Sequence, residues 1–340
     1  MSNYFNYHPE WIREDFVDFI AEKIHPLWAW KRIKASVISV MALSDDFYQI
    51  QLCPNHNFQP EQVRAGQSIL VTLPINGVRL QRSYSIVELT AAGDIVIAVR
   101  VQGQVSQALS QLTTGAVLEI SQAQGDFVLQ PNEQPLLLVA SGSGITAIYS
   151  LLNEALVTSQ RQIDVIYFSR DQAFHVKLHQ LAEQHPHLHY HPINTRQQHQ
   201  HLNLELLQQR VPHFEQADTY ACGHQAMMQA IQQIYQELNI ATQLKQEYFQ
   251  VSVDASLSSQ PVIFLRSQQQ FDANDTLLVS AEEAGLRPTH GCRMGICNAC
   301  SCTKVSGSTK NILTGEIDHD SNSQIKLCVH QALSPVVINL

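Results

Sequence analysis

Apolar residues recur at different intervals along the chain, and each interval predicts a different kind of element. From residue 35 to about residue 129, short β-rich runs are separated by Gly-containing turns, which is typical of a small antiparallel barrel. From Pro135 onward, the apolar strand Leu136–Ala140 is followed by a Gly-rich loop and a helix, and Thr219–Tyr235 repeats this unit. Such βαβ order predicts a parallel sheet. We expect the barrel strands at Ser36–Val40, Gln49–Leu52, Ser68–Leu73, Ile95–Val101 and Val117–Ile120.

The two ends of the chain carry different patterns. Residues 1–34 contain an amphipathic run at helical spacing, with apolar residues at Trp11, Ile12, Phe16, Phe19, Ile20 and Ile24. Such a helix can pack against the barrel or dock on a membrane or a membrane partner. Packing is favoured, because the opposite face carries acidic residues as much as Lys. At the other end, a polar linker leads into an α+β segment, residues 262–340.

Composition excludes several classes of protein. Hydrophobic residues make up 44% of the 340 residues and charged residues 15%, which excludes a disordered chain. The net charge of −9 argues against a nucleic-acid binder. No stretch reaches the roughly 20 apolar residues that span a bilayer, and the N-terminus lacks the order of a signal peptide. We therefore expect a cytoplasmic protein of two or three domains.

Five of the seven cysteines lie in the C-terminal segment. Cys292, Cys297 and Cys300 have the spacing C-x4-C-x2-C, and Cys328 follows them, which is the plant-type [2Fe–2S] pattern. A structural zinc site usually shows two C-x2-C pairs, and only one is present here. We therefore expect these four cysteines to be ligands of a [2Fe–2S] cluster. Cys302 is expected to be a small buried residue beside the cluster.

A histidine-rich tract precedes the second half of the parallel sheet. His185, His187, His189 and His191 alternate, so a strand would place all four on one face. Imidazole is a common metal ligand, which makes a metal site one interpretation. A solvated strand edge is favoured, because the sequence shows no Cys or carboxylate support nearby.

Arg82-Ser83-Tyr84-Ser85 follows a hydrophobic strand and resembles the Arg-x-Tyr-Ser flavin motif of the ferredoxin–NADP reductase superfamily. In that family the arginine pairs with the flavin phosphate, and the tyrosine ring and serine hydroxyl contact the isoalloxazine; a guanidinium fork and a hydroxyl suit these roles. A second segment resembles the family's phosphate-binding loop, with Gln102 in place of a usual Gly. The resemblance implies a catalytic Ser85 and FAD, or alternatively FMN, held by Arg82, Ser83, Tyr84, Ser85, Val101, Gly103, Gln104, Val105 and Ser106.

Two further segments resemble the nucleotide-binding part of the same family. After the first parallel strand the chain reads Gly-x-Gly-Ile-Thr, and such a turn lets backbone N–H groups meet a pyrophosphate. Cys222-Gly223 resembles the family's Cys-Gly-Pro, whose Cys lies beside the nicotinamide, with His224 in place of Pro. The resemblance implies a catalytic Cys222 and NAD(P)H bound by Gly142, Ser143, Gly144, Ile145, Thr146, Cys222 and Gly223.

The choice of coenzyme depends on the end of the second parallel strand. Ser169 and Arg170 favour NADPH over NADH because Arg suits a 2′-phosphate, although the acidic Asp171 follows directly. Further on, residues 247–249 resemble the family's Glu-x-Phe segment. This implies that Phe249 lies beside the flavin, with ordinary core packing as the alternative.

The order of the motifs predicts an electron-transfer chain. A hydride carries two electrons and a [2Fe–2S] cluster accepts one, so a flavin is needed between them. We expect an N-terminal amphipathic extension (1–34), a flavin-binding β-barrel (35–130), an NAD(P)-binding α/β domain (131–250), a linker (251–261) and a β-grasp ferredoxin domain (262–340).

The electron acceptor is the part of the function that the sequence determines least. Residues 25–28, His-Pro-Leu-Trp, resemble the leader of reductases that feed membrane-bound acyl desaturases. The favoured function is therefore an NAD(P)H-dependent reductase for a membrane-bound fatty-acyl desaturase or hydroxylase. Such a protein would not be transmembrane itself but would lie peripherally at the inner face of the membrane. The alternatives are the reductase component of a soluble Rieske-type oxygenase and an electron carrier with a vestigial nucleotide site.

Overall fold

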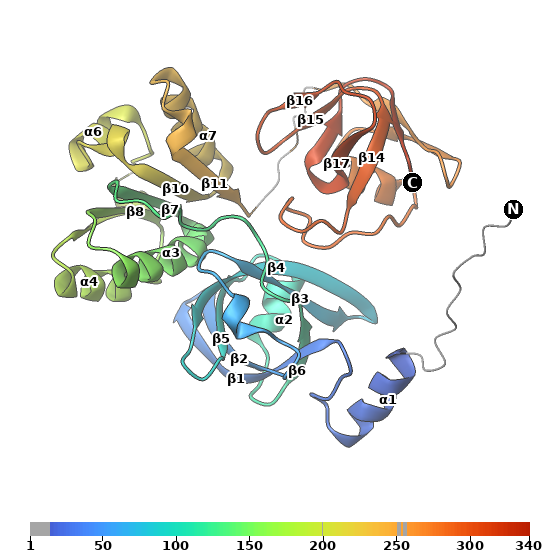
Figure 1. Ribbon diagram of the computed structural model, residues 1–340, viewed down its shortest axis with the longest axis horizontal. Helices are drawn as coiled ribbons and strands as arrows, with labels where there is room; N and C mark the ends of the chain where they lie inside the picture. The colour runs from blue at the N-terminus through green and yellow to red at the C-terminus, as the bar shows by residue number, and fades with distance from the viewer. Residues whose placement is uncertain (1–13, 199, 250–252, 254–256) are drawn as a thin grey trace, which may run out of the picture.

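The computed structural model describes residues 14–198, 200–249, 253 and 257–340. Three bodies follow one another along the chain, as Figure 1 shows: a barrel, a parallel α/β layer structure and a smaller mixed-sheet domain. The expected fold classes of all three are confirmed. Five of the eleven residues of the predicted linker, 251–261, lie outside the described residues, and the first strand of the third body already begins at Gln260.

The first body is a closed six-stranded barrel in the order β1-β2-β5-β4-β3-β6, with every neighbouring pair antiparallel. Alternate apolar residues of the strands fill its interior, which short helix α2 closes at one end. The flavin motif follows the hydrophobic strand β3, as predicted, but residues 82–85 lie inside the next strand, β4. The bounds are β1 (Ile33–Ser44), β2 (Phe47–Pro54), β3 (Ser68–Ile75), β4 (Val78–Leu89), β5 (Ile95–Arg100), α2 (Gln104–Ser110) and β6 (Val117–Ile120).

The second body is a five-stranded parallel sheet in the order β11-β10-β7-β8-β9. Helices α3 and α4 pack on one face and α6 and α7 on the other, so the central strands are apolar on both sides. The bounds are β7 (Leu136–Ser141), α3 (Ile145–Thr158), β8 (Ile163–Ser169), α4 (His175–Gln184), β9 (Leu188–Asn194), α5 (Thr195–Gln198), α6 (Leu204–Arg210), β10 (Asp218–Gly223), α7 (Gln225–Glu237) and β11 (Leu244–Tyr248).

The third body contains a mixed sheet in the order β13-β12-β19-β14-β17, a small second sheet β16-β15-β18, and helix α8. Only the β12–β19 pair in these sheets is parallel. The bounds are β12 (Gln260–Phe264), β13 (Gln269–Ala273), α8 (Leu277–Glu283), β14 (Ser301–Ser306), β15 (Thr309–Asn311), β16 (Ile317–Asp318), β17 (Ser323–Lys326), β18 (His330–Ala332) and β19 (Val336–Ile338).

The barrel and the parallel sheet share one hydrophobic core. Gly66 marks the closest approach: a Cβ on this residue would lie 1.9 Å from the carbonyl oxygen of Phe127 and 2.7 Å from Leu151 of α3. The Gly66 N–H also donates to the hydroxyl of Ser150 at 3.2 Å, and its φ of +86° favours glycine. The two bodies are therefore packed without room for even a methyl group at this point.

Helix α1 (Glu14–Ile24) directs its acidic residue Asp18 toward the interior of the protein. Asp18 is fully buried, forms an ion pair with Arg32 at 2.7 Å and accepts a hydrogen bond from the Trp30 N–H. The apolar residues Phe19, Ile20, Ile24, Trp28 and Trp30 are instead exposed. These five apolar residues therefore do not pack on the barrel. Trp11 and Ile12, which belong to the predicted run, lie outside the described residues.

No helix among the described residues is long and apolar enough to cross a membrane.

Candidate functional site

A cavity of about 340 Å³ opens at the side of the barrel, where β4, β5 and the start of α2 meet. Ser85 lies in its wall with an exposed fraction of 3%, and its hydroxyl has no hydrogen-bond partner among the described residues. A buried, unpaired hydroxyl is costly unless a ligand completes its bonding. The residues predicted for the flavin that line this cavity are Arg82, Ser83, Tyr84, Ser85, Gly103, Gln104, Val105 and Ser106; Val101 is the one that does not.

The electrostatics of this cavity suit an anionic ligand. Burial and then the nearby Arg293 lower the pKa of the Arg82 guanidinium, while Tyr84 and Glu282, which pairs with Arg293, oppose this shift. Ser106 organises the adjacent loop, because its hydroxyl accepts hydrogen bonds from the N–H groups of Gln102 and Gly103. The loop forms although Gln102 replaces the family's usual Gly, because the backbone N–H of Gln102 still donates to the Ser106 hydroxyl. The residues present therefore fit a flavin phosphate at this end of the cavity.

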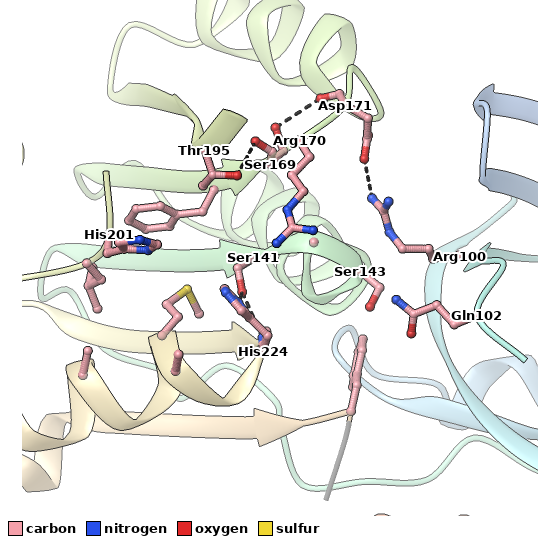
Figure 2. Close-up of a pocket in the computed structure, with 18 residues that line it drawn as sticks. Arg100, Gln102, Ser141, Ser143, Ser169, Arg170, Asp171, Thr195, His201 and His224 are labelled. Atoms are coloured by element: carbon pink, nitrogen blue, oxygen red, sulfur yellow. Dashed lines mark hydrogen bonds and ion pairs between the residues drawn. The ribbon is translucent and has the colours of Figure 1, made fainter. Parts of the chain in front are cut away.

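A second cavity, of about 330 Å³, lies at the carboxyl ends of β7, β8 and β10, and Figure 2 shows it from close by. Gly144 and Gly223 give it its shape. A Cβ on Gly144 would lie 2.1 Å from the Cys222 carbonyl oxygen, and one on Gly223 would lie 2.0 Å from the Ser141 hydroxyl. Only glycine therefore permits the turn after β7 to approach the end of β10, where a pyrophosphate can meet the following helix.

The far end of this second cavity is polar and basic. Figure 2 shows the Arg170 guanidinium directed into the cavity, with Thr195 and His201 beyond it. Burial lowers the pKa of His224, and Arg170 and His201 lower it further. Ser169 is held in place, because its hydroxyl contacts His175 Nε2 at 2.6 Å and donates to the Asp171 carbonyl at 3.1 Å.

The acidic Asp171 does not compete with these basic groups. Its carboxylate pairs with Arg100 of β5 at 2.5 Å and accepts a hydrogen bond from the Ala173 N–H. Arg100 also pairs with Asp46 at 2.9 Å and lies over the Phe47 ring. This ion network joins the barrel to the parallel sheet at the rim of both cavities.

The two cavities meet. Arg100, Gln102, Ser143 and Phe249 line both of them, so ligands bound in the two cavities would adjoin each other at these residues. Of the residues predicted for the nucleotide, Gly142, Ser143, Ser169, Arg170 and Gly223 line the second cavity, Thr146 lines the first, and Gly144, Ile145 and Cys222 are buried directly behind the walls.

Two titratable groups lie behind the junction. Cys222 ends β10 fully buried, and burial raises the pKa of its thiol well above the ordinary value. Glu247 is paired with it in register on β11; burial, and then Cys292, raise the pKa of this carboxyl to about 8. At neutral pH Glu247 is therefore mainly protonated. A neutral acid at this point carries a proton without placing a charge beside the hydride path.

The four predicted cluster ligands lie together in the third body, with the sulfurs of Cys300 and Cys328 3.3 Å apart. The N–H of Cys292 donates to the Cys297 sulfur at 3.2 Å, and the N–H groups of Met294 and Cys297 donate to the Cys292 sulfur. Hydrogen bonds with Cys297 and Cys328 hold the pKa of the Cys292 thiol far below its usual range. Such a thiol-rich, N–H-lined loop fits the ligand set of an iron–sulfur cluster.

The loop around these cysteines bends through two left-handed residues. Arg293 has φ +61° and Gly295 has φ +76°, a conformation that a side chain other than that of glycine adopts only when it is held. Glu282 of α8 holds Arg293 through two oxygens, at 2.8 and 2.5 Å. The expected buried position of Cys302 is also found, in β14 beside the cluster loop.

The cluster loop packs against the barrel, and one side chain reaches both redox sites. Cys292 and Cys297 share a small apolar cluster with Leu70 of β3, against which Met294 and Ile296 pack. Met294 also lines the flavin cavity. A single residue thus contacts the cavity on one side and the cysteine loop on the other.

Comparison with known proteins identifies the three bodies. Residues 34–129 match the oxidoreductase FAD-binding domain, residues 138–233 the oxidoreductase NAD-binding domain, and residues 263–332 the 2Fe-2S iron-sulfur cluster binding domain. The chain belongs to the ferredoxin–NADP reductase superfamily. It is a member with a C-terminal plant-type ferredoxin domain and transfers electrons from NAD(P)H through FAD to a [2Fe–2S] cluster. Bound flavin supplies the step from two-electron hydride to single electrons.

Members of this superfamily resemble the chain over nearly its full length. An NADPH oxidoreductase of Mycobacterium tuberculosis is 28% identical over 93% of this chain and 86% of its own. The 3-chlorobenzoate-3,4-dioxygenase reductase subunit of Comamonas testosteroni is 28% identical over 88% and 94%. The solved structure of phthalate dioxygenase reductase shares the fold, with a TM-score of 0.60 and 22% identity over 90% of this chain and 97% of that one.

Several residues at the site carry no local sequence signal. Thr195 and His201 line the second cavity and belong to no motif that the sequence made recognisable; Arg100 begins the phosphate-loop segment and Met294 lies inside the cysteine motif, but neither was predicted to line a cavity. Each reaches the site through tertiary packing: Met294 is brought to the flavin cavity from a different domain. Glu247 could have been found, since the Glu-x-Phe segment contains it, but only its burial reveals the raised pKa.

Proposed function

We propose that the chain is the reductase component of an oxygenase system and delivers electrons from its [2Fe–2S] cluster to a soluble Rieske-type oxygenase. The observation that carries this proposal is the full-length likeness to the dioxygenase reductase subunit of Comamonas testosteroni, which covers 94% of that relative. Phthalate dioxygenase reductase has the same three-domain fold over 97% of its length. An oxygenase reductase needs the same parts: a hydride entry, a two-to-one electron step and a cluster that meets a partner.

NADPH is the coenzyme that the second cavity favours. Arg170 is directed into the cavity, His201 lies near it, and Asp171 is paired with Arg100, so the charge that faces the cavity is positive. These basic groups attract the 2′-phosphate of NADPH, which is an anion. The ribose of NADH carries no phosphate there and gains nothing from them. An electron carrier with a vestigial nucleotide site receives no support, since the glycines that shape this cavity are in place.

A membrane-bound desaturase as acceptor is the second candidate, and one observation favours it. The exposed aromatic and aliphatic residues of α1 and the following segment form an apolar surface with Lys23 beside it. Such a surface suits a lipid-associated partner and a peripheral position on the membrane. The proposal for a soluble oxygenase rests on full-length relatives and is the better supported of the two.

The acceptor is tested by following electrons into separated fractions of the source cells. The purified protein with FAD and cluster bound is mixed with NADPH and either the soluble fraction or washed membranes, and NADPH-dependent O₂ consumption is recorded. A soluble oxygenase predicts that O₂ uptake is restored only by the soluble fraction, and that the activity copurifies with a Rieske signal. Uptake restored by membranes alone would reject this proposal in favour of the desaturase.

A further inference from the structure

The parallel sheet contains a buried carboxylate on which three imidazoles converge. Asp164, the second residue of β8, has an exposed fraction of 2%. Its Oδ1 lies 2.9 Å from His191 Nε2 and 3.5 Å from His189 Nδ1, and its Oδ2 lies 3.1 Å from His213 Nε2. Gln162 donates a further hydrogen bond to Oδ2 at 3.2 Å. These four residues, Asp164, His189, His191 and His213, are called the His-Asp quartet below.

Tertiary structure rather than sequence proximity assembles the quartet. β8 and β9 pair in parallel with Asp164 opposite His189, and His191 lies two residues further on the same face of β9. His213 comes from the turn after α6, where the following Phe214 is fully buried and fixes the turn. The histidine tract, which has no carboxylate support in the sequence, thus finds its carboxylate on the neighbouring strand.

The convergence is not explained by hydrogen bonding. Among the described residues, His191 alone of the three imidazoles makes a hydrogen bond to Asp164. His213 Nε2 is buried and has no hydrogen-bond partner, despite its 3.1 Å distance from Oδ2. His189 Nδ1, at 3.5 Å, is beyond the usual range for such a bond. Two ring nitrogens therefore lie close to a buried carboxylate without making a hydrogen bond to it.

We propose that the His-Asp quartet is a binding site for a divalent zinc ion. Three neutral imidazoles and one carboxylate are ligands that zinc accepts, and they complete a closed, four-coordinate structural site. In a tetrahedral site with bonds of about 2.0–2.1 Å, neighbouring donor atoms are roughly 3.3 Å apart. The observed contacts of 2.9, 3.1 and 3.5 Å between imidazole nitrogens and carboxylate oxygens bracket that spacing.

Binding requires small rotations of the side chains. As the side chains are placed, no three His, Cys, Asp or Glu groups among the described residues could hold a metal ion, so imidazoles of the quartet must turn before an ion binds. His189 and His213 have exposed fractions of 50% and 27%, so their rings are free to adjust and an ion can enter from solvent. The buried Asp164 supplies the fixed negative charge.

The position of the quartet assigns the ion a structural role. Asp164 lies at the start of β8 and Ser169 at its end, so about 16 Å of strand separates the quartet from the nucleotide cavity. The ion would tie the edge strand β9 and the turn after α6 to the sheet. Electron transfer does not pass through it.

The test measures zinc on the FAD- and cluster-loaded protein. Wild type, His189→Gln, His213→Gln and the control His185→Gln, from the same tract but outside the quartet, are mixed with one equivalent of ZnCl₂ and dialysed. Metal is then counted by mass spectrometry, with iron as the internal reference for intact protein. Wild type and the control are expected to keep about one zinc per chain, and both quartet variants to lose it.

A second measurement is the thermal midpoint with and without ZnCl₂. Zinc should raise it by about 5 °C in wild type and the control, because an ion that binds only the folded state stabilises that state. Neither quartet variant should respond. Wild type that retains no zinc, or quartet variants that retain as much zinc and shift as far as wild type, would overturn the proposal.

Discussion

At the scale of single residues, the nucleotide cavity separates an acid from a base that are neighbours in sequence. Asp171 turns toward the barrel and pairs with Arg100, whereas Arg170 points into the cavity (Figure 2). In the sequence these two residues are adjacent, so the sequence alone does not determine whether the site is positively or negatively charged. The structure removes the acid from the site by giving it a partner 71 residues away in the chain.

Replacing Arg170 by Ala should weaken NADPH selectively. A charge-assisted hydrogen bond to phosphate contributes about 1.5–3 kcal/mol, so we expect KM for NADPH to rise roughly 10- to 100-fold. The KM for NADH should hardly change, because NADH lacks the 2′-phosphate. Steady-state reduction of ferricyanide with each coenzyme measures both constants.

The matched control for this change is Arg210→Ala, which removes a guanidinium at the end of α6 outside the cavity. It should leave both KM values unaltered. An equal rise for NADPH and NADH in Arg170→Ala would show that the arginine supports the cavity wall and does not read the phosphate.

At the scale of elements, the cluster loop is the part that joins two redox sites. It packs on β3 of the barrel and sends Met294 into the flavin cavity. The neighbouring Ile296 packs in the same apolar cluster but does not line that cavity; a Cβ added to Gly125 would lie 3.5 Å from its Cγ2. Two side chains of similar size on one loop thus differ in whether they reach the flavin.

Met294→Ala should slow the step from flavin to cluster and leave flavin reduction unchanged. Loss of the bridging side chain opens a gap between the two sites, and we expect the step to slow about tenfold, which corresponds to ~1.4 kcal/mol in its barrier. Anaerobic stopped-flow spectroscopy with NADPH separates flavin bleaching from cluster bleaching.

Two further variants serve as controls for Met294→Ala. Met294→Leu preserves the volume and should restore most of the rate, since such swaps are well tolerated. Ile296→Ala should affect the step much less than Met294→Ala. If the two alanine variants slow cluster reduction equally, the loop acts through its docking as a whole and Met294 has no special place.

The elements also show what sequence patterns can and cannot predict. Barrel, parallel sheet and cysteine loop follow from local periodicity and spacing, because each has its signal within one stretch of chain. β4 was not predicted as the strand that carries the flavin motif, because its first eight residues are mostly polar and residues 82–85 line a ligand cavity instead of filling a core. The orientation of α1 was equally hidden: nothing local reveals that Arg32 draws Asp18 inward.

The candidate sites also differ in whether their residues have a local signal in the sequence. The cysteines and the glycines of the nucleotide turn could be found because their spacing is fixed by a ligand. The His-Asp quartet could not, because Asp164 and His213 are 49 residues apart and meet only where the turn after α6 packs on the sheet. Met294 could not either, because its role depends on how two domains dock.

At the scale of the whole molecule, each of the three bodies corresponds to one cofactor: the barrel to FAD, the parallel-sheet body to NAD(P)H and the third body to the [2Fe–2S] cluster. Each has its own hydrophobic core or shares one with a single neighbour. The third body touches the barrel mainly through the small cluster around Leu70. Loss of its metal is therefore expected to leave the other two bodies intact.

Cys297→Ser should abolish the visible absorbance of the cluster and keep NADPH–ferricyanide activity within about twofold of wild type, because a cluster ligand is lost while the flavin site is untouched. Absorbance spectra and steady-state rates measure the two outcomes. Cys53→Ser, on strand β2 of the barrel, is the control and should retain both signals. Loss of flavin from Cys297→Ser would show that the third body is needed to hold the barrel together.

The close approach at Gly66 has a consequence for the timing of the reaction. Two domains that meet with no space for a methyl group, and that are further joined by the Arg100–Asp171 ion pair, cannot swing apart on a hinge without breaking a shared core. Hydride transfer is then not gated by domain opening. We expect the nicotinamide to enter a junction that is already formed, where Phe249 lines both cavities.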